Sequence, residues 1–215
     1  MDWLLNLFRN KTEVETVLPE NAELNLPHVV WIHGANASSL SFNFVRSKLP
    51  NLKSTLIDYS SSNGFYNNLN DIVEKVKPLG PVFVVGHSLG GLYALHLTRH
   101  VDVIGGVSIS TPFRGSSTAD WARFIVPKHQ LFRDIGRKSK PIVEARGIYP
   151  TVPWLQIVST AGNVPWHNGP NDGVVTIASM EHFSDRMDLT HIPVNHYEIM
   201  CSDLTVNAIS SRIVL

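Results

Sequence analysis

Short apolar runs alternate with amphipathic stretches along the first half of the chain. The run HVVWI at residues 28–32 is rich in β-branched residues and precedes His-Gly-Ala, so it predicts a buried strand that ends at a glycine loop. The stretch SLSFNFVRSKL that follows carries apolar residues at helical spacing. Continuous apolar strands that alternate with helices are typical of a parallel sheet covered on both faces, so we predict the α/β fold class. Further strands are predicted near 53–58, at 81–85 and at 103–109, and helices near 67–77 and at 88–99.

The pattern changes after Thr111-Pro112. Residues 113–150 hold aromatic and basic side chains and helical patches such as STADWARFIV, but no convincing strand, and we interpret them as an excursion over the sheet. A strand is predicted again at 153–159, followed by a loop of Gly, Pro and Asn at 161–173. The last predicted elements are a strand near 185–192 and a helix from about residue 202.

The N-terminus carries a short apolar run in MDWLLNLFRNK. A secretory signal has positive charge before its apolar run and small residues at a cleavage site after it, and neither is present. We interpret residues 1–27 as an N-terminal extension that forms an amphipathic helix on the domain; attachment to a membrane surface or a partner is the alternative. No run approaches the roughly 20 apolar residues that span a bilayer. Residues 28–215 have the length of one ordinary domain.

Charge and cysteine content narrow the partners and the compartment. Lys plus Arg and Asp plus Glu number 18 each, so the chain lacks the basic field that attracts nucleic acids. Cys201 is the only cysteine, which excludes an internal disulfide and a cysteine-based zinc site and fits a reducing compartment. A cytoplasmic location is the expectation, with secretion as the alternative if a signal peptide has been removed.

A GxSxG pentapeptide, Gly86-His87-Ser88-Leu89-Gly90, lies between a predicted strand and a predicted helix. Such a turn forces the serine into a strained backbone conformation, and the glycines leave room where a Cβ would collide with neighbouring chain. This context predicts a nucleophilic serine at Ser88. A glycine-rich turn with an incidental serine is the structural alternative.

A nucleophilic serine needs an imidazole to take its proton and a carboxylate to orient that imidazole. Both are expected downstream, the acid before the histidine. Asp172 is the first acidic residue after the strand that ends near Ser159, and it lies in a loop, although a turn-forming Asp-Gly is an alternative role. Asp185 and Asp188 are weaker candidates because they fall in or beside the next predicted strand.

His196 is the best-placed histidine for the base. It follows the last predicted strand and precedes the terminal helix, where a fold of this kind delivers its base to the serine. His182 falls in a predicted helix and His191 near a strand end, which favours structural roles for both. No HExxH or similar ligand spacing occurs, so we predict no catalytic metal and no cofactor. The oxyanion would be bound by the backbone N–H groups of Ala35 and Leu89, with His33 bracing the glycine loop.

Four segments, HGANASSLSFNF, GHSLGG, NDGVV and NHYEIM, resemble in this order the lipase and esterase branch of the α/β-hydrolase superfamily, and the match spans most of 28–212. The glycine loop followed by SFNF is similar to small bacterial lipases with little or no lid, a resemblance that implies the oxyanion donors Ala35 and Leu89. TPFRGS and NDG are similar to segments of larger bacterial lipases, which implies Asp172 as the acid. This chain has Gly86 where the small lipases usually have alanine, and it has more sequence between the nucleophile and the acid. Residues near 113–150 could therefore form a short lid.

The resemblance implies a serine esterase or lipase that attacks an apolar small-molecule or lipid ester and forms an acyl-enzyme. An acyltransferase or thioesterase with the same triad is one alternative, and a non-catalytic binding protein of the same fold is another. Aromatic side chains in segments that border the expected site suggest an apolar acyl chain, unless they serve core or lid packing. These are Phe113, Trp121 and Trp166, the proposed substrate-binding residues, together with Phe124, Phe132 and Tyr149.

Overall fold

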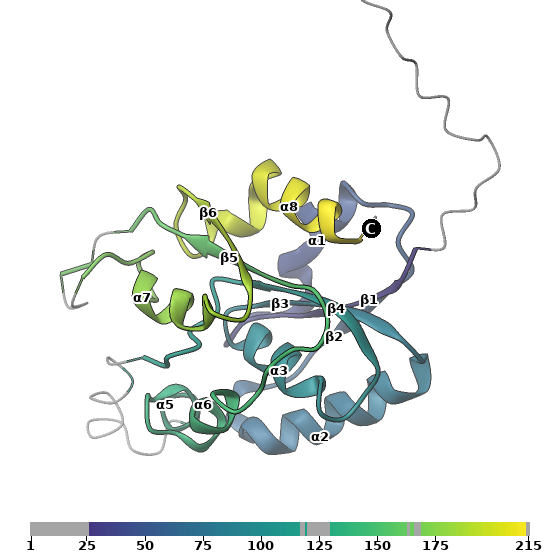
Figure 1. Cartoon of the computed structure of the whole chain (residues 1–215), viewed down its shortest axis with the longest axis horizontal. Helices are drawn as coiled ribbons and strands as arrows, with labels where there is room; N and C mark the ends of the chain where they lie inside the picture. The colour runs from purple at the N-terminus through teal and green to yellow at the C-terminus, as the bar shows by residue number, and fades with distance from the viewer. Residues whose placement is uncertain (1–25, 117–118, 120–129, 163, 166–168, 214–215) are drawn as a thin grey trace, which may run out of the picture.

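A six-stranded sheet with the order β2-β1-β3-β4-β5-β6 forms the centre of the computed structural model, and every neighbouring pair of strands is parallel (Figure 1). The structure describes residues 26–116, 119, 130–162, 164–165 and 169–213. The chain moves from β1 to the edge strand β2 and then returns to the other side of β1. The strands are β1 (His28–Ile32), β2 (Ser54–Ile57), β3 (Val82–His87), β4 (Val103–Ile109), β5 (Trp154–Ser159) and β6 (Asp188–Ile192).

The return of the chain between β1 and β3 creates a topological switch point. Ligands of open α/β sheets bind outside the carboxyl ends of the strands at such a point, because the two connections there leave in opposite directions. In this protein the loops that follow β1 and β3 contain His33-Gly34 and Ser88. The sheet order therefore brings the predicted oxyanion loop beside the predicted nucleophile.

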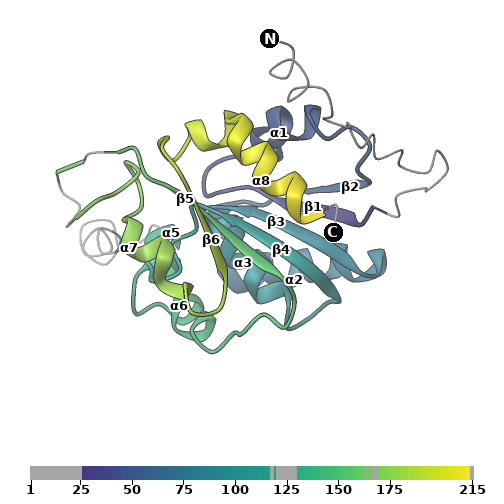
Figure 2. The ribbon, with the colours of Figure 1, turned by 45° about the horizontal axis from the view of Figure 1, so that its top comes forward.

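Helices cover both faces of the sheet (Figures 1 and 2). One face carries α2 (Phe65–Val76) and α3 (Leu89–Leu97), and the other carries α1 (Asn43–Ser47) and α8 (Asp203–Ile213). Alternate residues of each central strand enter two separate cores: Val84 packs with α2 and α3, whereas Val85 packs with α8. Because both faces of β1 and β3 are buried, their sequences are continuous apolar runs, as the α/β prediction requires.

The described part of the excursion after β4 contains α5 (Gln130–Ile135) and α6 (Lys140–Ala145). Ile142 and Ala145 of α6 are fully buried in the core that includes α3. The Asp134 carboxylate of α5 accepts hydrogen bonds from the Phe65 N–H at 3.0 Å and from the Gln130 amide at 2.9 Å. These contacts join α5 to the start of α2 and make both helices part of the layer on that face.

The remaining elements are short. They are α7 (Ile177–Met180) and the 3₁₀ helices η1 (Ser39–Phe42), η2 (Ser61–Asn63), η3 (Lys77–Leu79), η4 (Glu181–Phe183) and η5 (Glu198–Cys201). Within the described ranges, no helix combines the length and apolar character needed to cross a membrane. The N-terminal extension lies outside the described residues, apart from its last two positions.

Candidate active site

Ser88 occupies the sharp turn between β3 and α3, with φ 52° and ψ −120°. A positive φ is unfavourable for a residue with a side chain and costs on the order of 1–3 kcal/mol. The turn is held by hydrogen bonds from the Ser88 N–H to the Ile109 carbonyl at 2.8 Å and from the Gly91 N–H to the Ser88 carbonyl at 3.1 Å. This is the strained conformation that the pentapeptide predicts, and it places Ser88 at the carboxyl end of β3.

Two glycines allow this turn to pack closely. A Cβ atom on Gly86 would lie 2.4 Å from the Gly90 carbonyl oxygen, and one on Gly90 would lie 2.0 Å from the Ile32 carbonyl oxygen. Both neighbours are backbone atoms, which cannot move aside without displacing β1 or α3. Glycine at these positions therefore lets the start of α3 rest directly on the end of β1.

The close approach at Gly90 predicts a large loss of stability on substitution. Gly90→Ala is expected to lower the free energy of unfolding by about 3 kcal/mol or more, because the methyl group overlaps the Ile32 carbonyl. Gly147→Ala is the control, since its Cβ would have no neighbour nearer than 3.5 Å and no positive φ is required. Urea denaturation of both variants measures the difference; equal losses would contradict the proposed packing.

The Asp172 and His196 side chains form a buried pair, with 2.7 Å between Asp172 Oδ2 and His196 Nδ1. Asp172 is completely buried and His196 is 3% exposed. The backbone N–H of His196 also donates to the backbone carbonyl of Asp172 at 3.0 Å. An ionised carboxylate can only accept hydrogen bonds, so Nδ1 carries the proton and neutral His196 keeps a lone pair on Nε2. That nitrogen is available as a base.

Five hydrogen bonds, one of them backbone to backbone, order the segment around Asp172. Its Oδ1 accepts from the Val174 and Val175 N–H groups at 2.9 and 2.7 Å, and its Oδ2 accepts from the Ser159 hydroxyl at 2.5 Å. The Asp172 N–H itself donates to the Val175 carbonyl, and an amide of Gly173 is held by Asn171. Burial raises the pKa of the Asp172 carboxyl, but the hydrogen bond and charge of His196 and the bonds from Ser159 and Val175 outweigh burial and hold the pKa below its ordinary value. The carboxylate thus stays ionised beside His196.

His87 connects the nucleophile segment to the histidine loop. Its Nε2 lies 3.0 Å from the His196 carbonyl oxygen, and the two imidazole rings are 4.9 Å apart. Burial and the neighbouring His196 lower the pKa of His87 to about 3, so His87 is neutral at pH 7 and donates through Nε2. Sequence reasoning assigned it no role, although its place within the pentapeptide was a local signal.

Two buried histidines predict acid sensitivity. Burial also lowers the pKa of His96 to about 4. The hydrogen bond between its Nε2 and the Pro141 carbonyl, at 3.0 Å, acts in the opposite direction but is the smaller effect. Because the unfolded chain binds protons at these histidines near pH 6.5 and the folded protein does not, stability is lost as pH falls from 6.5 towards the folded pKa values. The free energy of unfolding should fall by up to about 1.4 kcal/mol per pH unit for each histidine.

Urea denaturation at pH 7.5 and pH 5 of the wild type and of His96→Gln tests this. The variant is expected to lose less stability between the two pH values, since one titrating group has gone. Equal losses in the two proteins would contradict the assignment of this acid sensitivity to His96.

The glycine loop after β1 is braced by its own His33 and by Tyr59, which follows β2. The His33 Nδ1–H group donates to the Gly34 carbonyl at 2.7 Å, as predicted for a bracing role, and the Tyr59 hydroxyl donates to the His33 carbonyl at 2.8 Å. The His33 and Tyr59 rings stack at 4.3 Å. A Cβ on Gly34 would lie 3.0 Å from His87 Nδ1 and 3.2 Å from Ser88 Cβ. Glycine therefore brings the backbone before Ala35 close to the nucleophile.

A cavity of about 560 Å³ opens at the carboxyl ends of the strands. Ser88, His196, Ala35 and Leu89 all border it, so the structure brings together four of the predicted site residues around one space; Asp172 lies behind His196. The described residues that line it include no Asp, Glu, Lys or Arg. Its other lining residues are Gly34, Asn36, Ala37, Ser41, His87, Pro112, Ser116, Ala119, Leu131, Phe132, Ile135, Val174, Val175, Tyr197, Met200 and Cys201.

The aromatic residues predicted to border the site lie in different surroundings. Phe132 of α5 lines the cavity, whereas Phe113 is completely buried and packs on Phe183 with ring centroids 4.9 Å apart. Phe113 is therefore a core residue and not a lining residue as predicted, because its side chain packs in the hydrophobic core, while the neighbouring Pro112 borders the cavity. Tyr149 is exposed beneath the Arg186 guanidinium. Trp121, Phe124 and Trp166 lie outside the described residues.

The weaker candidates for the acid and the base lie elsewhere. Asp188 pairs with Arg212 at 2.8 Å and His191 with Glu181 at 2.6 Å, both at the surface of the protein. Asp185 contacts its neighbour Arg186, and His182 packs beside Phe183. Across the described residues, no group of three or more His, Cys, Asp or Glu side chains is arranged to hold a metal ion.

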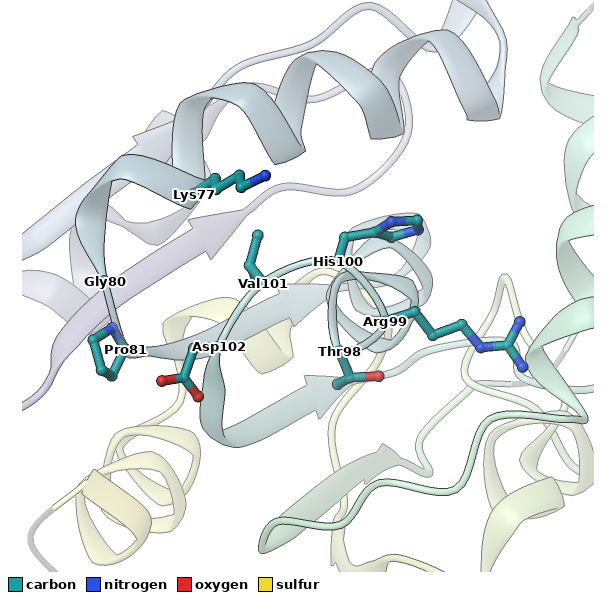
Figure 3. Close-up of a pocket in the computed structure, with 8 residues that line it drawn as sticks. All are labelled: Lys77, Gly80, Pro81, Thr98, Arg99, His100, Val101 and Asp102. Atoms are coloured by element: carbon teal, nitrogen blue, oxygen red, sulfur yellow. The ribbon is translucent and has the colours of Figure 1, made fainter.

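A second pocket, of about 440 Å³, lies where β3 and β4 begin (Figure 3). This pocket lies at the amino ends of the strands, at the opposite end of the sheet from Ser88. Ligands of parallel α/β sheets bind at the carboxyl ends, where Ser88 lies. The Arg99 guanidinium points away from it and donates to the Gly147 carbonyl at 2.9 Å. Its lining residues are Lys77, Gly80, Pro81, Thr98, Arg99, His100, Val101 and Asp102.

Comparisons with known proteins agree with this architecture. The structure is similar to a lipase-esterase related protein from Clostridium acetobutylicum ATCC 824, with 13% identity, a TM-score of 0.62, and coverage of 88% of this chain and 96% of the other. It is also similar to a marine microorganism esterase (14% identity, TM-score 0.60, 86% and 95% coverage) and to the thioesterase domain from the curacin biosynthetic pathway (15%, 0.58, 89% and 92%). At these identities the likeness establishes the fold alone.

At the level of sequence, comparison with curated proteins gave no match. The profile of the Alpha/beta hydrolase family matches residues 29–194, which include the glycine loop, the pentapeptide and Asp172 and end two residues before His196. This match covers more than half of the chain and agrees with the parallel sheet, the helices on both its faces and the strained serine turn. The chain therefore belongs to the alpha/beta hydrolase family.

Proposed function

We propose that this protein is a serine carboxylic-ester hydrolase, an esterase or lipase that acts on apolar acyl esters. The observation that carries the proposal is the shared cavity: the strained Ser88 and the Asp172-oriented His196 border the same space, and its described lining residues include no Asp, Glu, Lys or Arg. A serine in this conformation exposes its hydroxyl above the sheet, and an imidazole oriented by a buried carboxylate is the base that such a hydroxyl requires.

The reaction begins when His196 Nε2 takes the proton of the Ser88 hydroxyl as its oxygen attacks the ester carbonyl. The C–O bond to the leaving alcohol then breaks, and His196 returns the proton to that oxygen. Water next attacks the acyl-enzyme while His196 accepts one of its protons; the bond between the acyl carbon and Ser88 Oγ then breaks, and His196 returns the proton to Ser88 Oγ, which releases the acid and free Ser88. The Asp172 carboxylate stabilises the imidazolium that forms in each half-reaction.

Two backbone N–H groups would bind the negative charge that develops on the carbonyl oxygen. Leu89 is the first residue of α3, so its N–H has no acceptor within the helix and lies at the positive end of the helix dipole. Ala35 follows the glycine loop that His33 and Tyr59 brace. Donors fixed in place before the reaction stabilise the charge without reorganising.

The cavity supports an uncharged, largely apolar substrate. Burying a charged group beside Leu131, Phe132, Ile135 and the two valines that follow Asp172 would cost more than it gains, because no opposite charge is present among the described lining residues. The cavity volume also falls within the range of roughly 300–1,000 Å³ that is typical of small-molecule sites. We therefore propose short- to medium-chain acyl esters as substrates.

Hydrolysis of p-nitrophenyl acetate, butyrate, octanoate and palmitate tests the activity and the acyl preference together. A fluorophosphonate probe provides an independent test, since it phosphonylates an activated serine with loss of fluoride, and mass spectrometry then locates the label. Turnover of the shorter esters and a label on Ser88 are expected. A protein that is inert towards every ester and takes up no label would overturn the proposal; a label without turnover would favour transfer to another acceptor.

A further inference from the structure

A line of buried hydroxyl groups continues from the Asp172–His196 pair into the sheet. Ser159 is the last residue of β5, and its Oγ lies 2.5 Å from Asp172 Oδ2, the oxygen that also accepts from His196. Ser110 directly follows β4, and its Oγ lies 2.6 Å from Ser159 Oγ. Both serines are completely buried. Neither belongs to the cavity lining or to any of the motifs that predict the triad.

The direction of these hydrogen bonds follows from the chemistry of the groups. The Asp172 carboxylate can only accept, so Ser159 must use its single hydroxyl proton toward Oδ2. Ser110 must then be the donor to the Ser159 oxygen. Hydrogen bonds arranged in one direction polarise each other, which makes Ser159 a better donor to the carboxylate.

The backbone of Ser110 supports a specific role for this arrangement. It has φ 51°, and the other non-glycine residues described with positive φ are Asn36 in the glycine loop and Ser88 itself. The Ser110 N–H donates to the Ile157 carbonyl at 2.8 Å, which ties the strained residue to β5. Residues held in this region are maintained by their surroundings and cluster at functional sites.

We propose that Ser159, supported by Ser110, is a positioning residue for the triad: it holds the Asp172 carboxylate in the rotation that presents Oδ2 to His196. This inference rests on the proposed hydrolase function. The Val174 and Val175 N–H groups hold Oδ1 and the Ser159 hydroxyl holds Oδ2, so the carboxylate is restrained at both oxygens. Without Ser159, Oδ2 would keep His196 as its hydrogen-bond donor and the plane of the carboxylate would be less restrained.

The test compares Ser159→Ala with Ser179→Ala. Ser179 is also a buried serine and its hydroxyl donates a hydrogen bond at 2.8 Å to the Gly115 carbonyl instead of to Asp172, and Ser179 is not among the described residues that line the cavity. Ser159→Ala is expected to lower kcat for p-nitrophenyl butyrate about tenfold, the effect of losing one hydrogen bond to a charged group, with KM within about twofold of the wild type. Ser110→Ala should give a smaller decrease in kcat. Ser179→Ala should leave kcat unchanged.

The pH profile separates positioning from a purely structural role. Removal of one donor makes the Asp172 carboxylate more basic, so the Asp172–His196 pair holds its proton more tightly and the acidic limb of kcat/KM moves to higher pH. Among the described residues, the other rings in contact with His196 are those of Tyr197 and His87, and His87 is neutral above about pH 3 and does not titrate in this range. Loss of packing alone would lower the melting temperature and leave the acidic limb in place.

Ser159→Cys keeps most of the side-chain volume but has a weaker hydrogen-bond donor, so it preserves the test if Ser159→Ala fails to fold. Its kcat is expected to be lower than that of the wild type, by less than tenfold. Wild-type kcat and an unmoved acidic limb in the folded Ser159 variants would overturn the positioning role. An inert wild type that also resists the fluorophosphonate would instead overturn the proposed function, so the two failures are distinguishable.

Discussion

Ser88→Ala is expected to lower kcat for p-nitrophenyl butyrate by at least about 10⁴-fold, because it removes the proposed nucleophile, the hydroxyl on the strained turn that borders the same cavity as His196. The decrease should fall on kcat, since the apolar walls that bind the acyl chain are unchanged. Stopped assays at high enzyme concentration measure the residual rate. A variant that keeps more than a tenth of the wild-type kcat would show that Ser88 is not the nucleophile.

The backbone of Ser88 provides the control for this loss. Glycine adopts a positive φ readily, so Ser88→Gly should be as inactive as Ser88→Ala but more stable than it by about 1 kcal/mol. Urea denaturation of the two variants measures this difference. If both variants are inactive and folded, and Ser88→Gly is the more stable of the two, unfolding is excluded as the cause of the lost activity.

His196→Ala is expected to have an effect of similar size, again at least about 10⁴-fold on kcat, because the Ser88 hydroxyl loses the base that accepts its proton. Residues that act as one unit are not additive, so the Ser88→Ala/His196→Ala double variant should be no slower than the slower single variant. Rates that multiply in the double variant would contradict a shared mechanism.

Asp172→Asn is the matched variant for the orientation of His196. The asparagine amide has nearly the same shape, but it no longer offers a carboxylate to the Nδ1–H group, which allows the imidazole to adopt the wrong tautomer. A decrease in kcat on the order of 10³–10⁴-fold is expected, smaller than that of His196→Ala. Equal activity of Asp172→Asn and the wild type would remove Asp172 from the proposed triad.

Local sequence patterns predicted the elements of the fold well. Buried parallel strands must be apolar on both faces, so runs such as HVVWI and PVFVV identify themselves without reference to distant residues. The strained turn at Ser88 is also a local property, because the glycines it needs lie within the same pentapeptide. Asp172 and His196 were placed by their order after Ser88 and by their position in loops, and the structure brings their side chains to 2.7 Å from each other.

Contacts between segments far apart in the chain carried no such local signal. Phe113 and Phe132 look alike in the sequence, yet Phe113 packs on Phe183 in the core while Phe132 reaches the cavity. Ser110 and Ser159 meet only because β4 and β5 are neighbours in the sheet, which no property of either serine indicates.

The sequence by itself therefore determined the α/β class and the positions of the strands, and it predicted the serine, acid and histidine of the candidate site, because each depends on hydrophobic periodicity or on a short motif. Only the tertiary structure decided the strand order, the walls of the cavity and the hydroxyl groups behind Asp172. The physical reason is that strand pairing and side-chain packing join residues tens of positions apart, and their free energy depends on partners that become neighbours only when the chain has folded.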